Sequence, residues 1–190
     1  MTYVYIISLI PAVLWTIAYW PVTDRLSDSF GLFLSIGQVT GLIGLSLYSI
    51  SLILSTRPKF LENLFDGLNQ IYKKHHLIGG LSFIFMMVHP IFLIFSRLSI
   101  SFEYARSLII PGYDFYIDLG IISLSLIMTL LIITFYTKLP YQIWRLTHKL
   151  TGLVFLIAVF HSFLIPSTIS ENKLLWGYML TIVSLGIISY

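Results

Sequence analysis

Long apolar stretches separated by short polar segments make up most of the chain. Six such stretches run for 16 to 25 residues each, and they are residues 3–20, 30–54, 77–95, 119–136, 150–165 and 174–190. A helix needs about 20 apolar residues to cross the hydrocarbon core of a bilayer, whereas a spanning strand is about 9–11 residues long and alternates between apolar and polar positions. The pattern therefore predicts an all-α integral membrane protein, a bundle of six transmembrane helices surrounded by the lipid bilayer.

Composition favours a membrane protein and excludes several other classes. Hydrophobic residues make up 57% of the 190 residues and charged residues 10%, whereas a soluble domain averages about 45–50% and about 25%. A water-soluble globule, a disordered chain and a nucleic-acid-binding module are therefore not expected. The chain has no cysteine, which excludes disulfides, iron–sulfur ligation and thiolate zinc sites. Any metal must be held by histidines or carboxylates.

Charged residues between the stretches predict the orientation of the chain. The segments after the second and fourth stretches hold seven basic and two acidic residues: Arg57, Lys59, Lys73, Lys74, Lys138, Arg145, Lys149, Glu62 and Asp66. The other three segments hold four basic and six acidic residues: Arg25, Arg97, Arg106, Lys173, Asp24, Asp28, Glu103, Asp114, Asp118 and Glu171. Because basic residues collect on the cytoplasmic side of a membrane, the first set marks that side, and both termini are predicted to be cytoplasmic.

The segment 57–74 is predicted to form a short amphipathic helix on the inner membrane surface, with an ordinary loop as the alternative. Its apolar residues recur at helical spacing with polar residues between them. They are Phe60, Leu61, Leu64, Phe65 and Leu68.

Four of the five histidines form two similar arrays. His75 is followed 14 residues later by His89, and His148 is followed 13 residues later by His161. Each array begins at the cytoplasmic mouth of an apolar stretch and ends deep inside it. A glycine lies four residues after the first histidine of each array, at positions 79 and 152. A histidine inside a membrane is costly unless it is paired or binds a ligand, so the arrays indicate a binding site rather than hydrogen-bonded packing.

This pattern suits haem. Haem iron can take two axial imidazoles from opposite sides of the porphyrin, and two facing helices with histidines at matching depths supply such a pair. A second pair about 21 Å along the helices supplies a second haem. Glycine one turn after the first histidine leaves room for a porphyrin edge. The four histidines are therefore predicted to ligate the iron of two stacked haems.

Two histidines need further comment. A spacing of 13 residues places His148 and His161 about 140° apart around an ideal helix, so His148 is expected on an irregular first turn. His76 points about 100° away from His75, and we expect it to contact the surface or a haem propionate rather than iron.

The two histidine arrays, together with motifs elsewhere in the sequence, resemble the ferric-reductase-like transmembrane domain that ferric reductases and NADPH oxidases share. They resemble the bacterial branch of this family most closely. The motifs are Gly37-Gln38-Val39-Thr40-Gly41-Leu42-Ile43-Gly44, Arg57-Pro58-Lys59-Phe60-Leu61-Glu62, Gly67-Leu68-Asn69, His89-Pro90 and Trp144-Arg145-Leu146-Thr147-His148. The resemblance covers nearly all of residues 1–190.

The resemblance implies two b-type haems that carry electrons one at a time across a bacterial plasma membrane. The donor is a cytosolic flavin reduced by NAD(P)H. The acceptor on the outer face is dioxygen, which gives superoxide, or ferric iron. In this pattern His75 and His148 hold the inner haem, and His89 and His161 hold the outer one.

Full-length members usually continue into a cytosolic domain that binds FAD and NAD(P)H. Because the sixth stretch is still apolar at Tyr190, we expect residues 1–190 to be the membrane half of a longer protein, with the flavin domain missing or supplied by a separate flavoprotein. The alternative is the branch without a flavin domain that serves methionine-sulfoxide repair.

Further residues are candidates for supporting roles. Arg57 and Lys149, with Lys74, are placed to bind the propionates of the inner haem, and Arg97 and Arg106 those of the outer haem; topology-setting charge is the alternative for each. Gln38 could face the acceptor.

A non-redox transporter with buried histidines in a proton path is the remote alternative from another class. It would require repeat symmetry or intramembrane carboxylates, and the second to sixth stretches contain no Asp or Glu.

Overall fold

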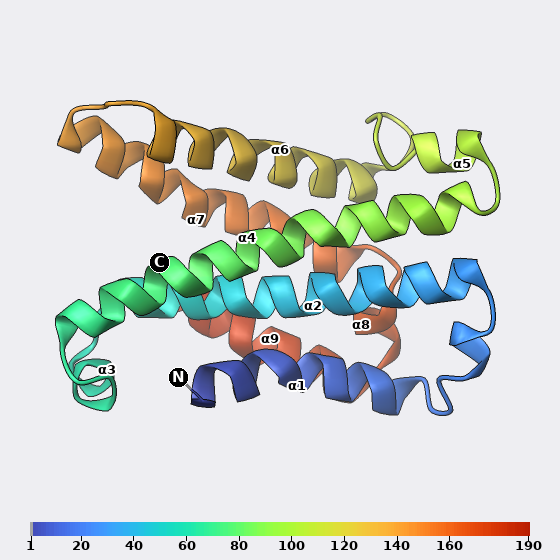
Figure 1. Cartoon of the computed structure of the whole chain (residues 1–190), viewed down its shortest axis with the longest axis horizontal. Helices are drawn as coiled ribbons and strands as arrows, with labels where there is room; N and C mark the ends of the chain where they lie inside the picture. Colours follow the sequence, from blue (N-terminus) through green and yellow to red (C-terminus); the bar gives the residue numbers. More distant parts are fainter. Residues whose placement is uncertain (1) are drawn as a thin grey trace.

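The structure, a computed structural model, describes residues 2–190, which form helices joined by short connections (Figure 1). In chain order these are α1 (Thr2–Ala18), the 3-10 turn η1 (Asp24–Leu26), α2 (Ser29–Ser55), α3 (Lys59–Leu64), α4 (Leu68–Leu98), α5 (Phe102–Arg106), α6 (Phe115–Tyr136), α7 (Tyr141–Leu164), α8 (Thr168–Glu171) and α9 (Lys173–Ser189).

Four of the described helices, α2, α4, α6 and α7, are long and apolar enough to cross a membrane. They confirm four of the predicted stretches as helices of spanning length. The first and sixth stretches also form apolar helices, α1 and α9, but each has only 17 residues, which corresponds to about 25 Å of helix. The all-helical membrane architecture is therefore confirmed, and the count of six spans stays a prediction.

The two helices that carry the histidine arrays begin nine residues earlier than their apolar stretches, at Leu68 for α4 and at Tyr141 for α7. Their first turns carry polar residues that can continue a helix beyond the hydrocarbon core. Basic residues that the sequence places in connecting segments therefore lie on helices instead. They are Lys73, Lys74, Arg145 and Lys149.

The prediction of one amphipathic helix over 57–74 is wrong in its length. The helix α3 ends at Leu64, and the chain then turns through Asp66 and Gly67, whose φ angles are +60° and +110°. A positive φ is costly for most residues and easy for glycine, so Gly67 ends this segment and lets α4 begin at Leu68. Within α3, Leu61 is buried whereas Phe60 is 65% and Leu64 51% exposed, so the apolar side chains predicted to share one face are divided between the interior and the surface of the bundle.

The long helices pack as two adjoining pairs. α4 lies along α2 and α7 lies along α6, while α1 and α9 also pack on α2. Glycines in α2 allow the close approach of α4, since a Cβ on Gly37 would lie 2.7 Å from the side chain of Leu93, and one on Gly44 would lie 3.0 Å from Met86. Small residues at such contacts are typical of membrane helices. α4 and α7, in contrast, are not packed along each other within residues 2–190.

The bundle has two ends, which we name after the short helices that lie there. The α3 end holds residues 56–67 and the connection 137–140 between α6 and α7, and the α5 end holds residues 19–28, 99–114 and 165–172. Both chain termini lie toward the α3 end (Figure 1).

Candidate functional site

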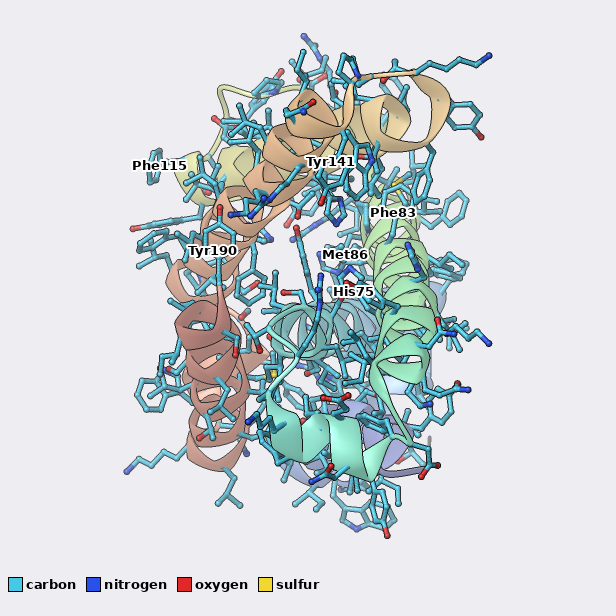
Figure 2. The ribbon with its side chains drawn as sticks, turned by 90° about the vertical axis from the view of Figure 1, so that its left-hand side faces the viewer. His75, Phe83, Met86, Phe115, Tyr141 and Tyr190 are labelled. Carbon is cyan, nitrogen blue, oxygen red and sulfur yellow. The ribbon has the colours of Figure 1, made fainter. Side chains whose placement is uncertain are left out.

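The four predicted haem ligands lie on α4 and α7 in two levels. His75 and His148 each lie seven residues after the start of their helix, near the α3 end. Their ring centroids are 6.1 Å apart, and their ring planes cross at 88°. His89 and His161, 14 and 13 residues further along their helices, form the second level, toward the α5 end. In the view from the α3 end, His75 and Met86 lie in the middle of the bundle, between α4 on one side and α7 and α9 on the other (Figure 2).

The first level has a separation that fits two ligands on one iron. A histidine nitrogen bonds a metal at about 2.0–2.1 Å, so two imidazoles on opposite sides of one metal have ring centroids about 6.3 Å apart. The observed 6.1 Å matches this value. Among residues 2–190, no three His, Asp or Glu side chains converge as they would around a bare metal ion. Paired histidines without a third protein ligand suit a metal whose remaining ligands come from a porphyrin.

Hydrogen bonds fix the ring orientation of three of these histidines. The Nδ1 atom of His89 donates to the carbonyl oxygen of Gly37 at 2.7 Å, and that of His161 donates to the carbonyl oxygen of Tyr116 at 2.7 Å. His75 Nδ1 lies 3.0 Å from the carbonyl oxygen of Ser51 and 3.1 Å from its hydroxyl. Because a carbonyl oxygen can only accept, Nδ1 carries the proton and Nε2 keeps a free lone pair. Metal-binding histidines are held in this same way.

His148 is different from the other three. Its Nδ1 atom is buried and has no hydrogen-bond partner among the described residues. Its ring instead stacks on the indole of Trp144, with centroids 5.3 Å apart and planes only 5° from parallel.

Two glycines make room for the second pair of rings. A Cβ on Gly41 would lie 2.6 Å from Nδ1 of His89, and a Cβ on Gly120 would lie 2.8 Å from the ring of His161. These glycines therefore let each imidazole lie flat against the neighbouring helix, α2 or α6. Gly120 was not singled out from the sequence, because no spacing along the chain shows that α6 passes behind His161.

The glycines that follow His75 and His148 do not have the role predicted for them. Gly79 faces the hydroxyl of Ser51, 3.2 Å from where its Cβ would lie, and Gly152 lies directly against the aromatic ring of Tyr190. Both glycines therefore serve contacts between helices rather than leaving space for a porphyrin edge.

The irregular first turn predicted at His148 is also wrong. α7 is a continuous α-helix from Tyr141 to Leu164. Its two histidines point in different directions around the helix, His148 toward His75 of α4 and His161 toward the Tyr116 carbonyl of α6. A regular helix therefore accommodates the 13-residue spacing.

Two tyrosine hydroxyls hold α7 close to His148. Tyr48 of α2 donates to the carbonyl oxygen of Thr151 at 2.6 Å, and Tyr190 donates to that of Lys149 at 2.9 Å. These bonds attach the α3 end of α7 to α2 and to the last residue after α9.

His76 and the basic residues predicted for the inner haem lie around this end. His76 is exposed, and its ring is 5.9 Å from that of His75, which agrees with a surface position. Arg57 lies 4.3 Å from the centre of the Tyr72 ring and close enough to His75 for their charges to interact. Lys149 is exposed, and Lys74 lies 5.0 Å from the Phe65 ring. Arg57, Lys74 and Lys149 therefore all lie at the α3 end, near the first level of histidines.

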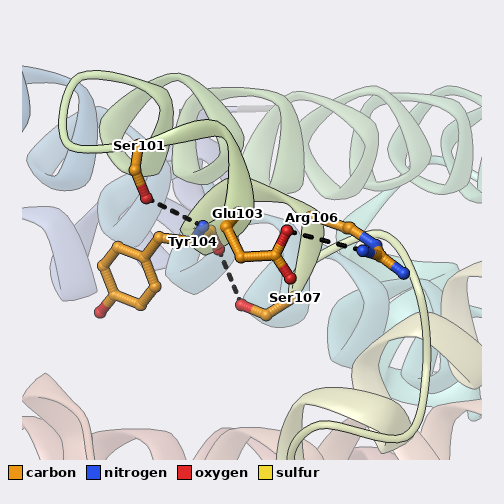
Figure 3. A network of polar contacts seen from close by, with 5 residues as sticks. All are labelled: Ser101, Glu103, Tyr104, Arg106 and Ser107. Atoms are coloured by element: carbon orange, nitrogen blue, oxygen red, sulfur yellow. Dashed lines mark hydrogen bonds and ion pairs between the residues drawn. The ribbon is translucent and has the colours of Figure 1, made fainter.

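At the α5 end the candidate residues already have partners within the chain. Arg106 pairs with Glu103 at 3.5 Å beside the cap that Ser101 provides for α5 (Figure 3), and the guanidinium of Arg97 lies 4.1 Å from the centre of the Tyr104 ring. The side-chain oxygen of Gln38 accepts hydrogen bonds from Trp15 and Arg25, each at 3.1 Å. Gln38 therefore ties α1 and η1 to α2.

Comparisons with known proteins identify a family but no individual relative. No curated protein matches the chain. The family model described as "Ferric reductase like transmembrane component" matches residues 40–159. This range contains His75, His89 and His148, and His161 lies two residues beyond it. Since the match covers more than half of the chain, the protein belongs to the family of ferric-reductase-like transmembrane components.

Proposed function

We propose that this multi-pass membrane protein transfers electrons one at a time across the bilayer through two b-type haems. His75 and His148 hold one haem, and His89 and His161 hold the other. The observation that carries the proposal is the geometry of His75 and His148, whose rings lie 6.1 Å apart with planes crossing at 88° although α4 and α7 are not packed along each other. Family membership supports it, because members of the family are generally oxidoreductases that work within membranes.

In this proposal the residues of the chain bind the two haems, orient the imidazole rings and insulate the haems from their surroundings. When bound, the haems supply one-electron redox chemistry that no amino-acid side chain of this protein provides. The carbonyl oxygens of Ser51, Gly37 and Tyr116 hold the imidazole rings and increase the donor strength of their Nε2 atoms. His75, His148, His89 and His161 would hold the two irons, and the haems would supply single electrons to an acceptor without binding it at the iron.

The two ends of the bundle define the direction of transfer. All six apolar helices cross the membrane in this proposal, with the α3 end and both termini in the cytoplasm, as the basic residues there favour. A flavin domain or flavoprotein that oxidises NAD(P)H donates electrons at the α3 end. Dioxygen or a ferric chelate accepts them at the α5 end of this plasma-membrane protein, and superoxide output compared with ferric-chelate reduction by the full-length protein distinguishes the two.

Haem content is the direct test of the proposal. The purified chain is expected to contain two haems, both low-spin and six-coordinate, because two histidine pairs give two bis-imidazole sites. Haem quantitation and a reduced-minus-oxidised spectrum measure this, and carbon monoxide should leave the reduced spectrum unchanged. A ratio near one haem per chain, or carbon monoxide binding at both sites, would contradict the pairing.

Alanine at Gly41 or Gly120 is expected to weaken the haem between His89 and His161. Each new Cβ would lie within 2.8 Å of an imidazole, so the ring must turn away from the carbonyl that holds it. Loss of such a supporting contact lowers metal affinity by about 10–100-fold, which haem transfer to an apo-acceptor protein measures.

Gly80 and Gly177 provide matched controls for these variants, because a Cβ on either would meet nothing within 4 Å. Gly80→Ala and Gly177→Ala should keep both haems at wild-type affinity. Equal haem loss in Gly41→Ala and Gly80→Ala would show that the effect comes from helix packing in general.

A further inference from the structure

One of the four proposed ligands, His148, lacks the hydrogen bond at Nδ1 that the other three have. The Nδ1 atoms of His75, His89 and His161 each bond to a backbone carbonyl. The Nδ1 atom of His148 is buried without a partner among residues 2–190. An imidazole bound to a metal through Nε2 can rotate about that bond, and a hydrogen bond at Nδ1 is the usual means of fixing its plane. Something else must fix the plane of His148.

Trp144 is placed to do so. It lies four residues before His148 on α7, which brings the two side chains to the same face of the helix one turn apart. The indole and imidazole planes differ by only 5°, with centroids 5.3 Å apart, which is an offset stack of the kind that aromatic pairs favour. Tyr141 continues the stack on the other side of Trp144, with centroids 5.9 Å apart and planes at 23°.

We propose that Trp144 is a positioning residue that replaces the missing hydrogen bond of His148 and holds its imidazole plane nearly perpendicular to that of His75. The proposal rests on the proposed function, because it concerns two ligands of one iron. The stack covers one face of His148 and resists rotation of the ring, and the Ser51 contacts resist rotation of His75. Together they maintain the crossing angle of 88°.

The angle between two axial imidazole planes has its own spectroscopic signature. Perpendicular planes give a strongly anisotropic low-spin ferric signal with one feature at large g, whereas parallel planes give a rhombic spectrum with three resolved features. Electron paramagnetic resonance of the oxidised protein therefore reports the orientation of His148 directly, apart from any activity.

The test compares W144F, which keeps an aromatic face, with W144L, which does not. The wild type and W144F should show the large-g signal of perpendicular planes for the haem at the α3 end. In W144L this signal should move toward the rhombic type, and retention of that haem should fall about 10-fold, the lower end of the range for losing a supporting contact. The haem held by His89 and His161 should be unchanged. Trp20 is 76% exposed, so W20L is the control for loss of a tryptophan and should match the wild type.

Each outcome either supports or overturns the role of Trp144 or the proposed function. An unchanged signal and unchanged haem retention in W144L would overturn the role of Trp144 while leaving the proposed function intact. A wild-type protein without haem between His75 and His148 would instead overturn the proposed function itself. If W144L loses both haems, then W144M takes its place, because methionine is a flexible apolar side chain without a ring. A difference in signal between W144F and W144M supports the proposal, and identical signals overturn it.

Discussion

Replacing His89 by leucine is expected to remove one of the two haems and to stop electron transfer to the outer face, while the other haem stays bound. Leucine has no lone pair to bind iron, and His161 alone cannot provide both axial ligands. The histidine levels are 14 residues apart along α4, about 21 Å, so the pair at the α3 end keeps its geometry. The haem-to-protein ratio should fall by half, and reduction of an external acceptor by proteoliposomes should fall to background.

His76→Leu is the matched control, because His76 lies next to a proposed ligand on the same helix yet is exposed. It should keep both haems and their spectra. Two haems retained in His89→Leu would refute the proposed pairing, and one haem lost in His76→Leu would mean that His76 rather than His75 is the ligand.

NADPH alone is expected to leave the haems of the isolated chain oxidised, whereas dithionite should reduce both. A nicotinamide releases two electrons together as a hydride, and haem iron accepts one at a time, so a flavin must act between them. The sequence of 190 residues contains no glycine-rich nucleotide loop or flavin motif. Stopped-flow absorbance at the haem bands, with NADPH in the presence and absence of a flavoprotein reductase, measures the difference.

The flavin-free chain provides the decisive arm of this experiment. Rapid haem reduction by NADPH without added flavoprotein would overturn the assignment of donor and acceptor roles. Reduction only when the flavoprotein is present supports it, and slower reduction at high salt would place the docking surface on the basic residues of the α3 end.

The membrane helices could be predicted well because the property that forms them is local. An uninterrupted apolar stretch must become a helix within a bilayer, where every backbone group needs a partner in its own segment, and α2, α4, α6 and α7 follow this rule. Their ends could not be predicted in the same way. The polar first turns of α4 and α7 extend both helices by nine residues, and the break at Gly67 depends on backbone conformation.

The histidines of the candidate site were visible in the sequence, and their role as haem ligands stays a prediction; the residues that support their rings were not predicted. The histidine arrays are visible along the chain, and the structure places the rings of His75 and His148 6.1 Å apart across α4 and α7. The contacts of Gly41, Gly120 and Trp144 depend on how helices lie beside one another, and on rotation of side chains. Gly152 shows the limit most clearly, because its position after His148 suggested space for a cofactor, whereas it packs against the distant Tyr190.

The pairing of helices also bears on how the protein is assembled. α4 packs along α2, and α7 along α6, but the two ligand helices are not packed along each other in residues 2–190. Each hairpin can therefore insert into the bilayer as a finished unit that carries one histidine of every pair. Since a metal centre contributes its binding energy to folding, haem would add a further link between the hairpins, beside the hydrogen bond from Tyr48 to Thr151 and the packing of α9 on α2. Hairpins produced as two separate chains in one cell should then co-purify in higher yield when haem is plentiful than when haem synthesis is blocked.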